Sequence, residues 1–348
     1  MTADELAGQV RQAAAERRAL RIVGGDTKAF LGRAVAGEAL STATHRGIVA
    51  YDPSELVVTA RAGTPLAEIE ARLAECGQRL AFEPPALGPQ STIGGVVAAG
   101  LSGPRRPFAG AVRDSVLGAV ILDGRGRVLR FGGQVFKNVA GFDAFRLMAG
   151  ALGSLGVILE VSLKAAPAPR REAAVALEMG SEPARAWLTR LMRRALPLSG
   201  AFHDGARLHL RLSGGSAGVE ALAREIGGEA EPLAFWDEVR DLRHAALVAD
   251  RPLWRLALPQ TAPIPPVGEL LAWDWAGAQL WIASEAAPWT IWRAAADAGG
   301  HATWFRGAPA DAEVFQPLAP ALMALHRRLK RALDPAGILN PGRLYREL

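Results

Sequence analysis

Three short glycine-rich segments carry residue types that could hold a large anionic ligand. They read Gly24-Gly25-Asp26-Thr27-Lys28, Ser91-Thr92-Ile93-Gly94-Gly95, and Gly150, Gly153 and Gly156 at every third position. Glycine lets the backbone approach a ligand closely, and successive amides at a strand-to-loop turn form an anion-binding nest. Each segment adjoins a run of β-branched residues. The pattern therefore predicts one extended polyphosphate ligand that is held mainly by backbone amides.

Two common nucleotide motifs are missing from the chain. The sequence Gly124-Arg125-Gly126 lacks the third glycine of the dinucleotide fingerprint and falls in an expected hairpin. No G-x-x-x-x-G-K-[ST] sequence occurs, which excludes a P-loop NTPase. A further span, from Val135 to Asp143 and including Lys137, combines small residues with a cation, an amide and a carboxylate.

Length and composition indicate a two-domain cytoplasmic protein. The chain has 348 residues, and half of them are hydrophobic, but no uncharged apolar run is long enough to span a membrane. The net charge of +5 comes mostly from scattered arginines without a dense basic run, so nucleic-acid binding is not expected. The first residues lack the apolar region and cleavage site of a signal peptide.

The single cysteine, Cys76, limits the redox chemistry of the chain. One thiol excludes an internal disulfide and a cysteine-ligated iron–sulfur cluster within this chain. Cys76 follows Leu66, Ile69 and Leu73 on an amphipathic helical pattern, so we expect a buried, inert thiol.

The first half of the chain alternates helical and strand patterns around the glycine-rich segments. Helices are expected over 5–19 and 65–76, the second with Thr64 as N-cap and proline in its first turn. Strands are expected over 20–23, 40–42, 47–51, 55–60 and 157–163, and a hairpin over 118–131. Residues 167–171, which are rich in proline and arginine, have the composition of a linker.

The composition changes after this linker. All nine tryptophans lie between residues 187 and 304, either as a second core or as anchors at a subunit interface. Strands are expected over 172–178, 206–212, 252–258, 278–283 and 301–305, and helices over 182–195, 216–226, 288–298 and 317–333. We therefore expect an α+β fold with domains at 1–168 and 169–315, followed by a tail, 316–348, that returns to the first domain.

Six motifs in order carry a resemblance to a known family. They are R-I-V-G-G-D-T-K at 21–28, S-T-I-G-G-V-V-A-A-G at 91–100, V-R-D-S-V-L-G at 112–118, K-N-V-A-G-F-D at 137–143, G-S-L-G-V-I-L-E at 153–160 and I-L-N-P-G-R at 338–343. The set resembles flavoproteins of the vanillyl-alcohol oxidase/PCMH type and, more narrowly, the FAD-binding E subunits of bacterial glycolate oxidase, also called glycolate dehydrogenase. The resemblance is weak over 170–315.

This resemblance implies a PCMH-type FAD-binding domain of two α+β subdomains and an α+β cap domain with a mainly antiparallel sheet. It places FAD against residues of all three glycine-rich segments and the tail. The implied contacts are Gly24, Gly25, Asp26, Thr27 and Lys28 at the pyrophosphate, Ser91, Thr92, Gly94 and Gly95 at the diphosphate and flavin, Arg113 and Asp114 after them, Gly156, Val157 and Ile158 at the adenine, and Asn340 at the flavin edge. Family members with covalent FAD carry histidine or cysteine in these motifs. This chain has neither there, so we expect non-covalent FAD.

The resemblance also implies a function within a larger enzyme. We expect an FAD-dependent oxidoreductase subunit that works with a catalytic FAD subunit and an iron–sulfur subunit on a small 2-hydroxy acid, glycolate. The six histidines show no metal-ligand spacing, so no metal site is expected, and no catalytic residue can be assigned. The complex would lie in the cytoplasm or peripherally at the inner face of the membrane.

Two other functions remain open. A self-sufficient dehydrogenase for D-lactate or a related acid would use Arg105, Arg106 and Lys137 to bind the substrate carboxylate, since charge-assisted hydrogen bonds suit that task. Alternatively, the two arginines lie in a solvated loop and bind no substrate. A third possibility is an assembly subunit that does not catalyse and keeps FAD as a structural ligand or has lost it.

Overall fold

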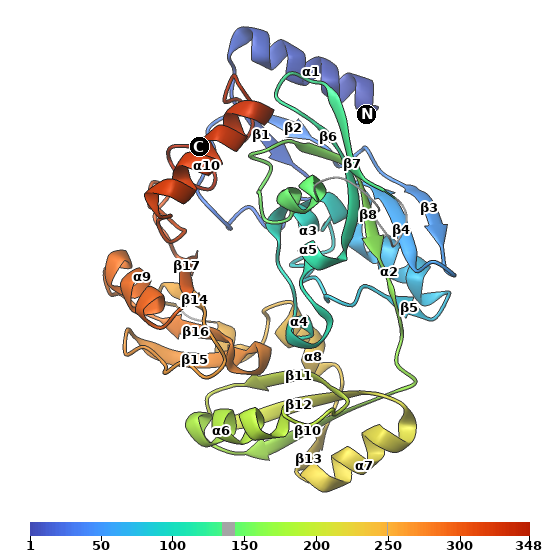
Figure 1. The fold of residues 1–348 in the computed structure, drawn as a ribbon, viewed down its shortest axis with the longest axis vertical. Helices are drawn as coiled ribbons and strands as arrows, with labels where there is room; N and C mark the ends of the chain where they lie inside the picture. The colour runs from blue at the N-terminus through green and yellow to red at the C-terminus, as the bar shows by residue number, and fades with distance from the viewer. Residues whose placement is uncertain (134–142, 249) are drawn as a thin grey trace. The chain divides into compact units, whose positions relative to one another are not determined.

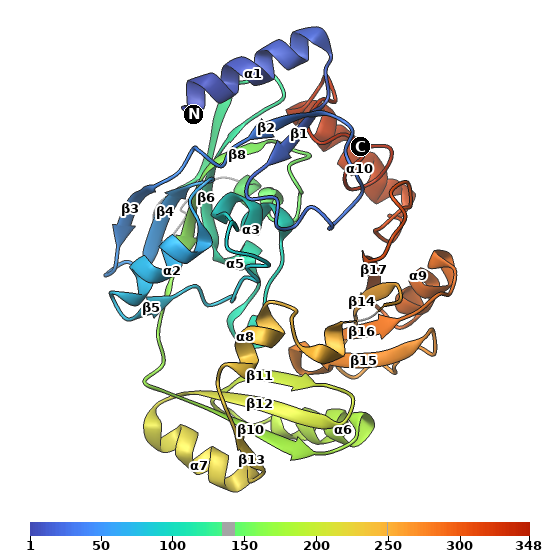
Figure 2. The same ribbon diagram turned by 180° about the vertical axis from the view of Figure 1, so that it is seen from behind.

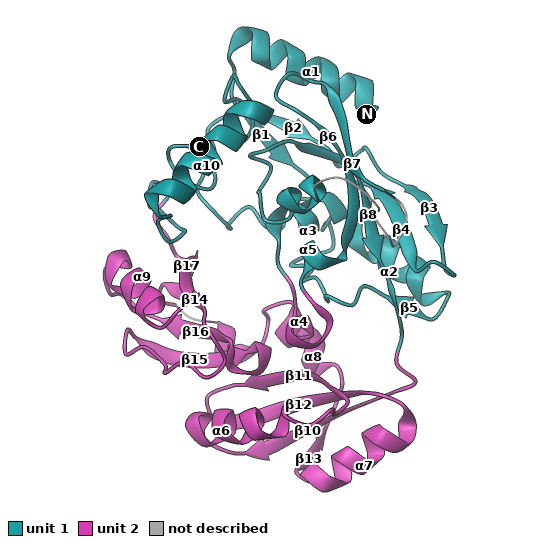
Figure 3. Ribbon diagram, in the orientation of Figure 1, with its two compact units in different colours: residues 1–101, 111–168, 310–348 teal, residues 102–110, 169–309 magenta. Residues whose placement is uncertain are grey.

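The computed structural model describes residues 1–133, 143–248 and 250–348, which form two compact units (Figure 3). Unit 1 comprises residues 1–101, 111–168 and 310–348, and unit 2 comprises residues 102–110 and 169–309. The expected domains differ from these units at two places. Residues 102–110 belong with unit 2, and residues 310–315 belong with unit 1. Unit 2 thus consists of two insertions into the chain of unit 1.

Unit 1 combines two main sheets with helices that pack against them (Figure 1 and, from behind, Figure 2). Its helices are α1 (Ala3–Glu16), α2 (Leu66–Ala74), α3 (Ile93–Ala99), α5 (Val112–Ser115), the 3-10 helix η1 (Ala144–Met148) and α10 (Pro320–Leu333). Its strands are β1 (Leu20–Val23), β2 (Glu38–Ser41), β3 (Ile48–Asp52), β4 (Val57–Arg61), β5 (Gln78–Arg79), β6 (Val116–Leu122), β7 (Val128–Gly132), β8 (Val157–Lys164) and β9 (Ala166–Pro167).

The larger sheet of unit 1 has the order β3-β4-β8-β6-β7 and is antiparallel throughout. Helix α3 packs on it through Ile93, Val96 and Val97, which are fully buried with Ile69 of α2 in one core cluster. The remaining positions of α3 are glycine and alanine, so the helix backbone lies close to its neighbours. The expected hairpin over β6 and β7 is confirmed.

The smaller sheet of unit 1 pairs β1 with β2 in parallel and receives the C-terminal tail. Leu339 forms a parallel bridge with Leu20, and both pack in a second core cluster with Leu6 and Val10 of α1. Chain segments more than 300 residues apart therefore share one small core. The tail was predicted to return to the first domain, and its residues Ile338 and Leu339 complete this core of unit 1.

Helix α10 is anchored to unit 1 by a buried ion pair. Lys330 Nζ donates to Asp334 Oδ2 and to the carbonyls of Ser154 and Leu339, each at 2.7 Å. Burial lowers the pKa of Lys330, and the Asp334 carboxylate partly opposes that shift. Asp334 in turn accepts the backbone N–H of Leu339. All three hydrogens of the ammonium group have acceptors, as a buried charge requires.

Unit 2 is built on one eight-stranded antiparallel sheet of order β13-β10-β12-β11-β15-β16-β14-β17. Its strands are β10 (Arg171–Glu178), β11 (Leu198–His203), β12 (Arg207–Gly214), β13 (Glu229–Glu231), β14 (Leu253–Ala257), β15 (Glu269–Asp274), β16 (Gln279–Ala283) and β17 (His301–Arg306). Its helices are α4 (Arg106–Ala109), α6 (Ser181–Leu191), α7 (Ser216–Ile226), α8 (Phe235–Arg240), η2 (Ala245–Leu247), η3 (Trp275–Gly277) and α9 (Pro288–Asp297). The expected α+β class with a mainly antiparallel sheet is confirmed.

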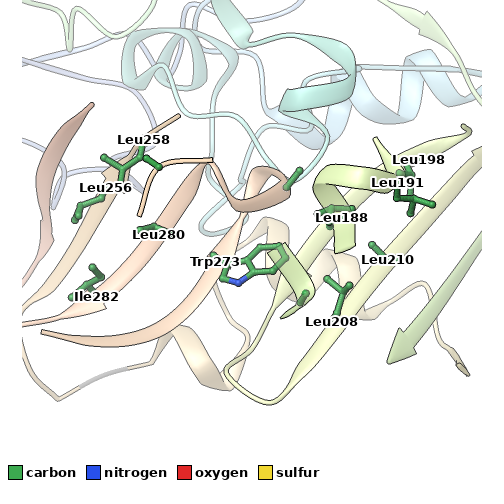
Figure 4. Close-up of a cluster of buried hydrophobic side chains, with 14 of the residues drawn as sticks. Leu188, Leu191, Leu198, Leu208, Leu210, Leu256, Leu258, Trp273, Leu280 and Ile282 are labelled. Atoms are coloured by element: carbon green, nitrogen blue, oxygen red, sulfur yellow. The ribbon is translucent and has the colours of Figure 1, made fainter. Parts of the chain in front are cut away.

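Most tryptophans of unit 2 belong to its core, part of which is shown in Figure 4. Trp236, Trp254, Trp273 and Trp281 are fully buried, whereas Trp289 is 61% exposed. Leu188 of α6, Val219 of α7 and Ile291 of α9 pack into the same cluster as the leucines of the central strands. The interpretation of the tryptophans as a second core therefore holds for the buried ones.

Several local predictions are wrong. Cys76 is exposed rather than buried, because α2 ends at Ala74 and the thiol falls in the following turn. Thr64 is not the N-cap of α2; its hydroxyl donates instead to the carbonyls of Arg61 and Gly47. The expected linker contributes Pro167 to β9 and Arg171 to β10. Strands β11, β13 and β15 were not predicted.

Among the residues that the structure describes, no helix is both long enough and apolar enough to cross a membrane.

Two histidines of unit 2, His203 and His244, have pKa values below the ordinary one. His203 Nε2 lies 2.8 Å from the Met179 carbonyl, and its Nδ1 accepts the backbone N–H of Gly205 at 3.0 Å. The lone pair that a second proton would need is therefore already used. Burial lowers the pKa of His203 from its ordinary value of 6.5, and burial lowers the pKa of His244 as well.

We expect unit 2 to lose stability as the pH falls from 7.5 through 6.5 to 5. The unfolded chain binds protons at these histidines at a higher pH than the folded chain, so the free energy of unfolding decreases on acidification. Urea unfolding followed by tryptophan fluorescence measures this, because all nine tryptophans belong to unit 2. The variant His203→Gln should show a shallower pH dependence. An equal slope in this variant and the wild type would contradict the assignment.

Candidate cofactor-binding site

Unit 1 contains a cavity that brings the glycine-rich segments and the tail together. Its volume is about 110 Å³, well above the roughly 10–15 Å³ that one water needs by the same measure. The lining contains twelve of the residues that the sequence singled out: Gly24, Gly25, Asp26, Thr27, Lys28, Thr92, Gly94, Gly95, Gly153, Gly156, Ile158 and Asn340. We call this space the glycine-loop cavity.

The loop after β1 offers a row of free backbone donors to the cavity. Among the described residues, no protein acceptor takes the amide hydrogens of Gly24, Gly25, Asp26 or Thr27. Backbone N–H groups seldom stay unpaired unless water or a ligand satisfies them. Asp26 also adopts a positive φ of 55°, which turns the loop back on itself. Four consecutive free amides in a turn suit the oxygens of a pyrophosphate.

Charges around the cavity favour an anionic ligand. Three cations line it, Arg21, Lys28 and Arg343, against one carboxylate, Asp26. Arg21 Nη1 lies 3.1 Å from Asp26 Oδ2, which fixes that carboxylate at the loop. Burial lowers the pKa of Arg343, but a guanidinium stays protonated at neutral pH. The net positive charge would offset the negative charge of a diphosphate.

Lys28 joins the first glycine-rich segment to the second. Its Nζ donates to Ser91 Oγ at 2.8 Å and to the Ala86 carbonyl at 3.0 Å. Ser91 is itself 2% exposed and does not line the cavity. The two loops are thus held together by a buried ammonium group and one hydroxyl.

The glycines of the cavity have two different roles. A Cβ on Gly25 would lie 1.6 Å from the Gln90 carbonyl oxygen, and a Cβ on Gly94 would lie 2.6 Å from the Ala62 side chain. These two glycines allow segments of the protein to touch. A Cβ on Gly95 would meet only Thr92 Oγ1, at 3.2 Å, and otherwise open space. Gly95 therefore leaves room for the ligand.

The other walls of the cavity are apolar and flat. They consist of small or branched side chains from several elements: Ile22, Val23, Ala62, Ala98, Ala99, Leu152 and Ile158. Helix α3 supplies Ala98 and Ala99, and its C-terminal carbonyls of Val97 and Ala98 accept the N–H groups of Gly150 and Leu152. A wall of small side chains next to helix backbone lets a planar ring system lie close to the protein.

Asn340 of the tail lines the cavity and joins three of its segments. Its Oδ1 accepts the Ile22 N–H at 2.8 Å, and its Nδ2 donates to the Leu152 carbonyl at 2.6 Å. Its own backbone N–H donates to the Leu20 carbonyl. Asn340 is 5% exposed with a φ of 42°. This one side chain holds β1, the third glycine-rich segment and the tail at fixed distances.

Two lining cations were missed as site residues, although both lie inside quoted motifs. Arg343 donates to the carbonyls of Arg33 and Ala29, at 2.7 and 2.8 Å, and so fixes the path of the first loop. Arg21 precedes the glycine pair on β1. Arg21 begins the motif R-I-V-G-G-D-T-K, and Arg343 ends the motif I-L-N-P-G-R. Their positions in these motifs could have identified both arginines as site residues.

Three other residues that the sequence singled out are not brought to the cavity. Val157 is fully buried in the core of β8. Arg113 and Asp114 lie on α5, with side chains 69% and 50% exposed, and Asp114 accepts the Ala111 N–H as an N-terminal cap. Lys137 and most of the span from Val135 to Asp143 lie outside the described residues.

The two arginines suggested as substrate ligands have structural partners in unit 2. Arg105 is 4% exposed and forms an ion pair with Glu172 and a hydrogen bond to Ser213. The guanidinium of Arg106 lies 4.2 Å from the ring centroid of Trp275. The expectation of a solvated loop is therefore wrong for Arg105, which attaches residues 102–110 to the sheet of unit 2.

The cavity can bind, but it holds few groups that could move a proton. Of the described residues that line it, none is a histidine, cysteine, tyrosine or glutamate. The described residues also contain no group of three or more histidine, cysteine, aspartate or glutamate side chains placed to hold a metal ion. Free amides, net positive charge and an apolar wall together fit a dinucleotide with a flat ring.

Comparisons with known proteins agree with this geometry. A family model described as "FAD binding domain" matches residues 1–132, and one described as "FAD linked oxidases, C-terminal domain" matches residues 307–344. Solved structures of alkyldihydroxyacetonephosphate synthase share the fold, with a TM-score of 0.64 at 14% identity over 97% of this chain and 74% of one of those chains.

Some similar proteins resemble only part of this chain, and one resembles nearly all of it. Glycolate oxidase subunit GlcD of Bacillus subtilis is 39% identical over 79 residues, 23% of this chain and 17% of that protein. D-lactate dehydrogenase of Archaeoglobus fulgidus is 26% identical over 199 residues, 57% of this chain and 44% of that protein. Glycolate oxidase subunit GlcE of Escherichia coli K12 is 46% identical over 341 residues, 98% of this chain and 96% of that protein. The chain therefore belongs to the GlcE family of FAD-binding glycolate oxidase subunits, which have the PCMH-type fold.

Proposed function

We propose that this chain binds FAD non-covalently as one subunit of an oxidase or dehydrogenase for a small 2-hydroxy acid, glycolate. Its partners would be a catalytic flavin subunit and an iron–sulfur subunit. One observation carries the proposal. The cavity is rich in backbone donors, yet among the described residues it contains no histidine that could act as a general base. Full-length similarity to a glycolate oxidase subunit supports the same function.

The cavity residues suggest how the cofactor would lie. The free amides of Gly24 to Thr27 would hold the pyrophosphate, with Lys28 and Arg343 supplying positive charge. The space beside Gly95 and Ala98 would take one end of the dinucleotide against helix backbone. Bound FAD supplies reversible electron transfer at its flavin ring. The protein would contribute orientation and charge rather than a proton acceptor.

The proposed partners would supply two functions for which the described lining of the cavity offers no group. Oxidation of a 2-hydroxy acid removes the hydroxyl proton, usually through a positioned base. Electrons that leave a flavin need an acceptor, and one cysteine cannot hold an iron–sulfur cluster. A catalytic flavin subunit and an iron–sulfur subunit would supply these two functions.

We expect acid precipitation to release the flavin completely. A covalent link needs a nucleophilic side chain, and the described lining offers no histidine, cysteine or tyrosine. The measurement is the absorbance at the flavin maximum of the supernatant and of the washed pellet after trichloroacetic acid treatment. It shows whether the flavin was released. A yellow pellet would show a covalent link. Purified protein without any flavin absorbance would contradict FAD binding itself.

We expect Gly95→Val to lower flavin occupancy at least tenfold while the protein stays folded. The valine side chain would extend into the space left for the cofactor. Flavin content per chain and the circular dichroism melting temperature are the measurements. Gly8→Val in α1 is the matched control, because that glycine is also helical and its Cβ would meet only Arg11, at 4.0 Å.

A contrasting variant separates cofactor space from loop packing. Gly25→Ala should lose both flavin and thermal stability, since its Cβ would collide with the Gln90 carbonyl. If Gly95→Val keeps full flavin occupancy, the proposed position of the cofactor is wrong.

We expect the isolated, flavin-loaded chain to be reduced by glycolate at least a hundredfold more slowly than the assembled complex, because a general base contributes about 10²–10⁴ in rate. The measurement is anaerobic bleaching of the flavin after mixing with excess glycolate or D-lactate. Dithionite serves as a control that the flavin can be reduced. Rapid bleaching of the isolated chain by either acid would instead indicate a self-sufficient dehydrogenase.

A further inference from the structure

Helix α10 exposes leucines and buries a lysine. Lys330 is its most buried residue, at 6% exposure, whereas Leu322 is 43% and Leu325 is 55% exposed. With Leu329, these leucines occupy positions i, i+3 and i+7, which fall on one face of a helix. Single exposed apolar residues are common on protein surfaces, whereas a contiguous group of them often marks an interaction site.

The rotation of α10 is fixed by its lysine. The three acceptors of Lys330 Nζ, on Asp334, Ser154 and Leu339, belong to unit 1 and hold that side of the helix inward. At 3.6 residues per turn, the leucine stripe is centred roughly 100° around the helix from Lys330. The stripe therefore stays at the surface unless the buried ion pair breaks.

A hollow lies beside this stripe, also within unit 1. Its volume is about 240 Å³, and Leu329, Leu155, Leu344 and Leu348 line it together with His326. Leu147 of η1 also contributes to the lining and is 44% exposed. We call the stripe and the hollow together the α10 surface. A concave apolar site of this kind can receive one large apolar side chain, as the anchor residues of protein interfaces do.

The edge of the α10 surface is cationic. Arg328 and Arg331 lie beside Leu325 and Leu329 on the helix, whereas Arg113, at the hollow, is paired with Asp114. Within the described residues, neither Arg328 nor Arg331 has a carboxylate partner. Helix α10 itself contains no acidic residue. A partner that covers this surface therefore needs carboxylates around its apolar contact.

We propose that the α10 surface binds another subunit of the same complex, through an apolar side chain that enters the hollow between acidic residues. This inference rests on the proposed function, which places the chain in a multi-subunit oxidase. The concave shape favours a protein partner over a lipid surface. Interfacial membrane helices present a convex apolar face that often carries aromatic residues, and α10 has none.

The experiment measures assembly of the tagged, flavin-loaded chain with the purified catalytic and iron–sulfur subunits. Leu325→Glu and Arg328→Glu should each raise the dissociation constant at least tenfold, and the second effect should shrink in high salt. Val49→Glu, on β3, matches the first change because Val49 is 44% exposed. Arg46→Glu, on the surface before β3, matches the second. Both controls should assemble within twofold of the wild type.

The outcomes separate this inference from the function on which it rests. Flavin content and circular dichroism of each variant first show that the fold is intact, as expected for exposed positions. Failure of the wild-type chain to assemble at all would overturn the proposed function and, with it, this inference. Wild-type assembly that Leu325→Glu leaves unchanged would overturn this inference alone.

Two further measurements test other occupants of the surface. Sedimentation with vesicles of phosphatidylglycerol and phosphatidylcholine, abolished by Leu325→Glu while assembly persists, would place a membrane on the α10 surface instead. A concentration-dependent dimer of the isolated chain, also abolished by that change, would place a second copy there. Either result would overturn the proposal.

Discussion

The glycine-loop cavity depends on the hydrogen bonds of a single amide side chain. Asn340 accepts from Ile22 and donates to Leu152, so it fixes the separation of the first loop and the third glycine-rich segment. A carboxylate could not donate to the Leu152 carbonyl, and an apolar residue would leave two buried backbone groups unpaired. The free amides of the first loop face a defined space only because this amide, some 300 residues later in the chain, holds the strand before them.

Glycine has separate physical roles in the same cavity. Gly25 and Gly94 remove side chains where two protein segments meet, whereas Gly95 removes one where the protein would meet a ligand. The sequence shows only that glycine is present at all three positions. The distinction matters because a substitution of the first kind changes the shape of the cavity, and one of the second kind changes only its volume.

The sequence predicted the secondary-structure elements and the binding loops better than the tertiary contacts of individual side chains. Periodicity and turn residues located β1 and α7 to the residue, and the motifs located the loops that the structure brings to the cavity. Strand β11 was missed because Leu198–His203 contains serine and glycine and is buried on both faces, so it shows no alternation. The burial of Arg105 depends on its contacts with Glu172 and Ser213, which a local pattern cannot reveal, and Cys76 is exposed because α2 ends before the amphipathic pattern does.

The return of the tail to β1 also affects the order in which the parts of the protein can fold during synthesis. Residues 169–309 form a separate unit between the two parts of unit 1, so a ribosome makes them before it makes Asn340. At about 5–20 residues per second, the stretch from residue 169 to Asn340 takes roughly 10–35 s to synthesise. During that interval the first loop and α3 exist without the side chain that spaces them. A nascent chain can therefore complete the glycine-loop cavity only after Asn340 has been synthesised, while unit 2 is free to fold earlier.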